Sequence, residues 1–144
     1  RLARVMDDGA LVFGRGTWER FAERWPNRTG EFPDAMNRAR KYVVSNTLTD
    51  VGAWSNSHLL TGDVRDSIER VRSDGDVAVV GSAPLAQALI GLGLVDELRL
   101  LVMPDVVGEG TRLFDHAPKA NLRLIGHESH DPGVLLTYEV APSN

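Results

Sequence analysis

The chain has 144 residues, of which 42% are hydrophobic and 25% charged, and its formal net charge is −4. This size and composition are typical of one globular domain with a buried core. The negative charge disfavours non-specific binding to nucleic acid, and the apolar runs are too short to span a membrane. With no cysteine in the sequence, disulfides, a thiolate nucleophile and sulfur-ligated zinc are excluded. A chain without cysteine fits a reducing compartment such as the cytoplasm.

The first eight residues have the pattern of a helix end. Leu2, Val5 and Met6 fall on one side of this segment, as in the last two turns of an amphipathic helix. A domain rarely begins there. We therefore expect that residues 1–144 form a single domain whose first strand lies before Arg1 and is absent from this chain.

Strands and helices alternate through the first two thirds of the sequence. Apolar runs that end at glycine or a polar turn predict buried strands, and amphipathic stretches after a capping residue predict helices. The expected strands are residues 10–14, 42–45, 58–60 and 77–80. The expected helices run from Trp18 to about Trp25 after a Thr17 cap, briefly after an Asp34 cap, from the Asp63 cap through Arg72, and from about Pro84 to Leu92 with Gly93 as the stop.

The last third changes pattern. Residues 97–103, 122–129 and 134–140 read as three strands, and only Asp131-Pro132-Gly133 separates the last two. Such a short connection predicts an antiparallel hairpin. Alternating strands and helices followed by a hairpin predict an α/β fold, with a sheet that is parallel first and mixed at one edge.

Small and polar residues follow three of the expected strands. Gly14-Arg15-Gly16-Thr17 would present backbone N–H groups and a guanidinium at a helix start, where an anionic phosphate is stabilised. Ser45-Asn46-Thr47 offers hydrogen bonds suited to a ribose or its phosphate, and Gly81-Ser82-Ala83 opens another helix. Each segment alone also reads as a turn with a cap. All three at strand ends favour a phosphate-binding rim, because ligands of α/β sheets bind beyond the carboxyl ends of the strands.

The ordered set of segments is similar to a known superfamily. The resembling segments are residues 11–19 (LVFGRGTWE), 41–48 (KYVVSNTL), 77–89 (VAVVGSAPLAQAL), 93–98 (GLVDEL) and 104–114 (PDVVGEGTRLF). Together they resemble the dihydrofolate reductase superfamily. The closer similarity is to the reductase domain of the riboflavin-biosynthesis deaminase-reductase and its stand-alone bacterial relatives.

This resemblance implies a dihydrofolate-reductase-like three-layer α/β sandwich that binds NADPH along the rim. By the match, Gly14, Arg15, Gly16 and Thr17 would hold the pyrophosphate, with Arg15 near the phosphates of the cofactor. Ser45, Asn46 and Thr47 would receive the adenosine ribose and its 2′-phosphate. The segment Gly81, Ser82, Ala83, Pro84 and Leu85 would pass under the nicotinamide half and the pyrophosphate.

The function implied is hydride transfer from NADPH to a small pteridine- or pyrimidine-like heterocycle, in a cytoplasmic homodimer. The bifunctional reductases tend to have an acidic residue and paired glycines where this chain has Val80-Gly81-Ser82, which argues against the riboflavin-pathway substrate itself. In the family the segment before the position of Arg1 supplies much of the substrate pocket, so no catalytic acid is assigned. An NADP(H)-binding regulatory or interaction domain without turnover, and a structural domain without ligand, are the alternatives.

Other chemically suggestive residues have simpler interpretations. His127 and His130 would point to opposite faces of a strand, so we expect no metal site there. The adjacent acids Asp96 and Glu97 diverge in an extended segment and are expected to be structural. Trp18 belongs either to the core or, being in the first helical turn, to the lining of the pocket.

Overall fold

The computed structural model describes residues 6–115 and 119–141. Contacts between residues divide the chain into two compact units, Arg1–Ala86 and Gln87–Asn144. We call these the N-terminal unit and the C-terminal unit. Among the described residues, no helix is long and apolar enough to cross a membrane.

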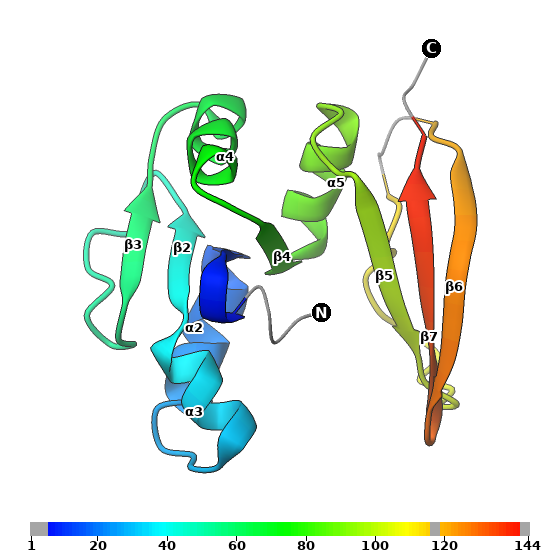
Figure 1. The fold of residues 1–144 in the computed structure, drawn as a ribbon, viewed down its shortest axis with the longest axis horizontal. Helices are drawn as coiled ribbons and strands as arrows, with labels where there is room; N and C mark the ends of the chain where they lie inside the picture. Colours follow the sequence, from blue (N-terminus) through cyan, green and yellow to red (C-terminus); the bar gives the residue numbers. More distant parts are fainter. Residues whose placement is uncertain (1–5, 116–118, 142–144) are drawn as a thin grey trace. The chain divides into compact units, whose positions relative to one another are not determined.

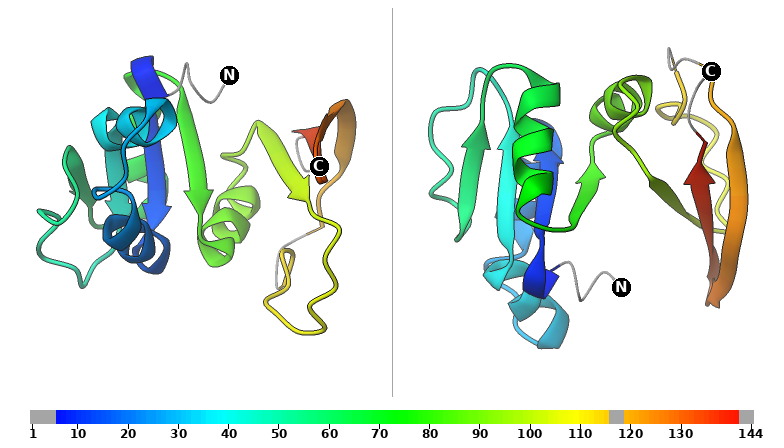
Figure 2. Two further views of the ribbon diagram at one scale, coloured as in Figure 1. Left: turned by 90° about the horizontal axis from the view of Figure 1, so that it is seen from below. Right: turned by 45° about the horizontal axis from the view of Figure 1, so that its top comes forward.

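The N-terminal unit is built on a parallel sheet of four strands. In chain order these are β1 (Ala10–Gly14), β2 (Arg40–Val44), β3 (Ser57–Leu60) and β4 (Val77–Gly81). Their order in the sheet is β3-β2-β1-β4, and the right-hand view of Figure 2 shows the four arrows pointing the same way. The carboxyl ends of all four strands therefore lie at one edge of the sheet.

Two helices connect β1 to β2, one connects β3 to β4 and one follows β4, whereas residues 45–56 join β2 to its parallel neighbour β3 without a helix. The helices are α2 (Arg15–Arg24), α3 (Glu31–Arg38), α4 (Val64–Ser73) and α5 (Ala83–Gly91), and residues 6–8 form a helical turn before β1. The Asp63 cap is confirmed, because its carboxylate accepts a hydrogen bond from the backbone N–H of Asp66 at 3.2 Å.

Two expected helix starts are wrong. Helix α2 begins directly after β1 with Gly14 at its N-cap, so Thr17 is inside the first turn and does not cap it. Helix α3 begins at Glu31 after Gly30, and Asp34 is likewise inside it. Gly30, with a φ of 128°, has a backbone conformation that other residues avoid, and it ends the preceding segment directly before α3. Gly14 is ordinary extended backbone, with φ of −70° and ψ of 161°, so α2 follows β1 without any special conformation.

Both faces of the sheet are covered. Leu11, Phe13 and Val43 pack in one aromatic-rich cluster with Trp18 of α2, Met36 of α3 and Trp54. Ala10 and Val12 alternate with these residues along β1 and are buried on the other face. This is why β1 reads as an uninterrupted apolar run, as central parallel strands do.

The C-terminal unit has an antiparallel sheet of three strands. They are β5 (Glu97–Val102), β6 (Leu122–His130) and β7 (Gly133–Val140), with β7 in the middle. Figure 1 shows β7 in red between β5 and the orange β6. The expected order of parallel strands first and an antiparallel hairpin last is confirmed, but the two parts form separate sheets instead of the one sheet, mixed at its edge, that the sequence predicts.

Lys41 is the most unusual residue of the core. It is fully buried on β2, and its ammonium group lies 4.6 Å from the ring centroid of Trp54. Its Nζ donates to the carbonyl oxygens of Met36, Asn37 and Ala39 at 2.9, 3.0 and 2.7 Å. These carbonyls lie at the C-terminal end of α3, where backbone acceptors lack helical partners. Burial lowers the pKa of Lys41 from 10.5 to about 8.

This pKa predicts a stability effect at alkaline pH. Between about pH 8 and pH 10.5, the unfolded chain holds more protons on Lys41 than the folded chain, so the free energy of unfolding rises with pH through this window. Relative to Lys41→Met, the wild type should gain about 2–3 kcal/mol across it. Urea unfolding of both proteins from pH 7.5 to 10.5 measures the difference between their free energies of unfolding. The contributions of the titrating groups that both proteins share cancel in this difference. A pH-independent or falling difference would contradict this assignment.

Candidate functional site

The three predicted rim segments lie at the ends of adjacent strands. Gly14–Thr17 follows β1, Ser45–Thr47 follows β2, and Gly81–Leu85 follows β4. Because β1 is paired with β2 on one side and β4 on the other, the structure brings all three segments to one edge of the N-terminal unit. We refer to residues 14–17, 45–47 and 81–85 as the rim.

Two glycines allow the ends of β1 and β4 to approach each other closely. A Cβ atom added at Gly14 would lie 2.7 Å from the Ser82 Oγ and 3.2 Å from the Ser82 backbone nitrogen. One added at Gly81 would lie 3.1 Å from the Thr17 Oγ1. Thr17 itself is buried, only 7% exposed, so these contacts leave little room for a larger side chain. The glycines are therefore required by space, whatever the rim binds.

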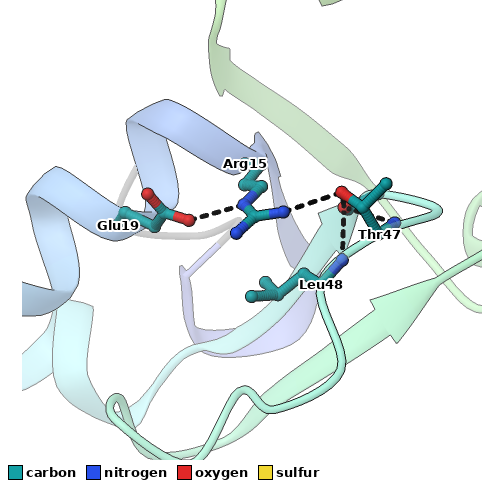
Figure 3. Close-up of polar contacts among 5 residues, drawn as sticks. Arg15, Glu19, Thr47 and Leu48 are labelled. Atoms are coloured by element: carbon teal, nitrogen blue, oxygen red, sulfur yellow. Dashed lines mark hydrogen bonds and ion pairs between the residues drawn. The ribbon is translucent and has the colours of Figure 1, made fainter.

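Arg15 links the first two rim segments. Its Nη1 donates a hydrogen bond of 2.7 Å to the Thr47 Oγ1, although 32 residues separate the two. Its Nε donates to the Glu19 Oε1 at 2.6 Å. Figure 3 shows the guanidinium held between helix α2 on one side and the loop after β2 on the other. Arg15 is about half exposed, so its remaining donors are open to a ligand from solvent.

The loop after β2 is shaped by its own side chains. The Ser45 hydroxyl accepts from the backbone N–H groups of Thr47 at 3.2 Å and Leu48 at 3.0 Å, as in a local serine turn. The Asn46 Oδ1 accepts from the Gly62 N–H at 2.8 Å, beyond the end of β3. These contacts fix the loop and leave Thr47 exposed at its tip.

The third rim segment carries the start of α5. Gly81, Ser82 and Ala83 are half-buried, Pro84 is exposed and Leu85 is buried. The Ser82 carbonyl accepts the Ala86 N–H at 3.0 Å and so joins the first turn of the helix. Helix α2 has no side-chain cap at its start. Because the first turn of a helix has free N–H groups, the starts of α2 and α5 present such groups at the rim, where they favour an anionic ligand.

Other residues that the sequence singles out make contacts within the protein. Trp18 is buried, and its Nε1 donates to the Ser57 Oγ at 3.1 Å, so it belongs to the core. His130 pairs with Glu128 at 3.2 Å. Glu97 contacts Arg99 at 2.9 Å. Within residues 6–115 and 119–141, no cluster of three or more ligating side chains could hold a metal ion.

Glu19 and Lys41 were not singled out from the sequence. The spacing of four residues between Arg15 and Glu19 is the signal that could have identified their ion pair. Lys41 carries no such signal, because a lysine inside a short apolar strand is more often read as an exposed residue.

Comparison with known proteins identifies the family. The sequence model of the RibD C-terminal domain matches residues 4–136 and so extends across both units. The uncharacterized protein YyaP of Bacillus subtilis (strain 168) is 27% identical over 135 residues, which are 87% of this chain and 70% of YyaP.

Two solved structures show the same fold. One is a "putative riboflavin biosynthesis protein" from Shewanella sp. PV-4, with a TM-score of 0.77 and 21% identity over 96% of this chain and 77% of that one. A pyrimidine reductase-like protein of Corynebacterium diphtheriae has a TM-score of 0.65 and 15% identity, over 99% of this chain and 80% of that one. The expected dihydrofolate-reductase-like fold is thereby confirmed.

The tight packing at the rim predicts opposite effects for two neighbouring glycines. Gly14→Ala should lower the free energy of unfolding by about 1–3 kcal/mol, because the new methyl group overlaps Ser82. Gly16→Ala is the matched control, since its Cβ would meet only the Arg20 side chain at 3.7 Å. Within helix α2 it should raise stability by up to about 1 kcal/mol. Urea unfolding of the two variants tests this, and equal effects would contradict it.

Proposed function

Because the chain belongs to the RibD C-terminal domain family, we propose that it is an NADPH-dependent reductase of a small pteridine- or pyrimidine-like heterocycle. The pyrimidine reductase-like protein of the same fold supports this substrate class. The observation that carries the proposal is the rim, where three adjacent strand ends combine an arginine, short hydroxyl side chains and two helix starts. We further propose a cytoplasmic location, as suits a biosynthetic reductase.

The rim residues fit a dinucleotide phosphate. Gly16 has no side chain to keep a pyrophosphate from the backbone, and the N–H groups of the helix start at Arg15 would stabilise its charge. Arg15 and Thr47 hold their polar groups 2.7 Å apart, so both could contact one phosphate. This pairing favours placing Arg15 with Ser45, Asn46 and Thr47 at the 2′-phosphate.

The proposed roles of the other rim residues follow from their positions. Gly14, Gly16 and Thr17 would bind the pyrophosphate, and Gly81, Ser82, Ala83, Pro84 and Leu85 would pass under the nicotinamide half. Bound NADPH would supply the hydride, and the protein would orient the cofactor and exclude water. No catalytic acid is assigned among the described residues.

Calorimetric titration tests the cofactor assignment. NADPH should bind more tightly than NADH, and Arg15→Ala should weaken NADPH binding by about 1–3 kcal/mol, because it removes a charge-assisted contact. Arg24→Ala is the matched control, since it removes the same charge from the far end of α2. Equal affinity for both cofactors, or equal losses in the two variants, would contradict the proposed site. NADPH binding without reduction of any heterocycle would favour a regulatory domain instead.

We also propose that the protein is a homodimer. The C-terminal unit exposes large apolar side chains, among them Val106 at 100%, Val107 at 77% and Leu124 at 51%, and exposed apolar surface of this kind marks association sites. Sedimentation equilibrium at micromolar concentration should give twice the mass of 15.8 kDa calculated for one chain. A mass of one chain under these conditions would contradict the proposal.

A further inference from the structure

Glu19 occupies part of the surface that the proposed phosphate needs. The guanidinium of Arg15 has five N–H donors. Its Nε is bound to the Glu19 carboxylate at 2.6 Å, and one donor on Nη1 is bound to Thr47 at 2.7 Å. A phosphate that binds an arginine bidentately through Nε and a neighbouring N–H must take the place of that carboxylate.

The geometry makes this replacement possible. Arg15 and Glu19 are one helical turn apart on α2, and their side chains are 46% and 47% exposed. An exposed pair of this kind contributes only about a 1.5- to 5-fold change in an equilibrium constant. A charge-assisted hydrogen bond from arginine to phosphate is stronger. The carboxylate can therefore weaken phosphate binding without preventing it.

Thr47 defines which phosphate is affected. It holds the same guanidinium from the loop after β2, the segment proposed to receive the 2′-phosphate. The carboxylate of Glu19 would then act on the group that distinguishes NADPH from NADH, whereas the pyrophosphate is common to both.

We propose that Glu19 is a specificity-determining residue that competes with the 2′-phosphate for Arg15 and so limits the preference for NADPH over NADH. This inference rests on the proposed function, because it assumes that the dinucleotide binds at the rim. It does not depend on which heterocycle is reduced.

The test compares two isosteric substitutions on the same helix. Glu19→Gln removes the charge and keeps an oxygen that can accept from the Arg15 Nε. Glu23→Gln removes the same charge one turn further along α2, at an exposed position. The dissociation constants of NADPH and NADH are measured for the wild type and both variants, at low and at moderate salt.

Glu19→Gln should lower the dissociation constant of NADPH by roughly 2- to 5-fold and change that of NADH by less than about 2-fold. Glu23→Gln should change neither dissociation constant by more than about 2-fold. The gain should shrink as salt is added, because exposed charges are screened. The urea midpoints should show that both variants remain folded.

Three results would overturn the inference. Weaker NADPH binding in Glu19→Gln would mean that the carboxylate orients Arg15 productively. An equal gain for NADH would mean that Glu19 acts on the pyrophosphate, and no change would mean that it does not meet the cofactor. If the wild type bound neither dinucleotide, the proposed function itself would fail, which is a separate and recognisable outcome.

Discussion

The close approach of β1 and β4 at Gly14 and Gly81 is the constraint on which the candidate site depends. Each glycine sits where one added methyl group would meet the neighbouring segment at 2.7 or 3.1 Å. The end of β1 is therefore packed against Ser82, and the end of β4 against the side chain of Thr17 in α2. Without that packing, the starts of α2 and α5 could not lie at one rim.

The second element of the site is the contact between Arg15 and Thr47. Parallel pairing of β1 with β2 in register places Gly14 opposite Val44, so the residues that follow the two strands are neighbours. The serine turn at Ser45 then presents Thr47 to the guanidinium. Register and local turn chemistry together produce a polar site from residues far apart in the sequence.

Much of this arrangement could be predicted from the sequence, because the strong signals are local. The apolar runs of β1 and β4 and the Asp63 cap each determine their own segment. The start of α2 is not predicted correctly: Thr17 has the side chain of a typical cap, but the N-cap is Gly14, three residues earlier, and the helix follows β1 directly.

Contacts between distant segments could not be predicted in this way. The Arg15–Thr47 bond depends on strand register, which the alternation of apolar residues does not specify when both faces of a sheet are covered. The burial of Lys41 depends on carbonyls from α3 and a ring from Trp54 that only the folded chain brings together. The expectation of NADPH as the cofactor comes from the family resemblance, because no spacing of residues indicates that cofactor by itself.

The most direct test of the central claim is ³¹P NMR of NADP⁺ bound to the protein near pH 6. A free 2′-phosphate is partly protonated there, since its second pKa is about 6. If the 2′-phosphate contacts the Arg15 guanidinium, its resonance in the complex should be that of the dianion at this pH. In Arg15→Ala, the resonance should return to the position it has in free NADP⁺ at the same pH. A 2′-phosphate resonance that titrates in the complex as it does in free NADP⁺ would contradict the account.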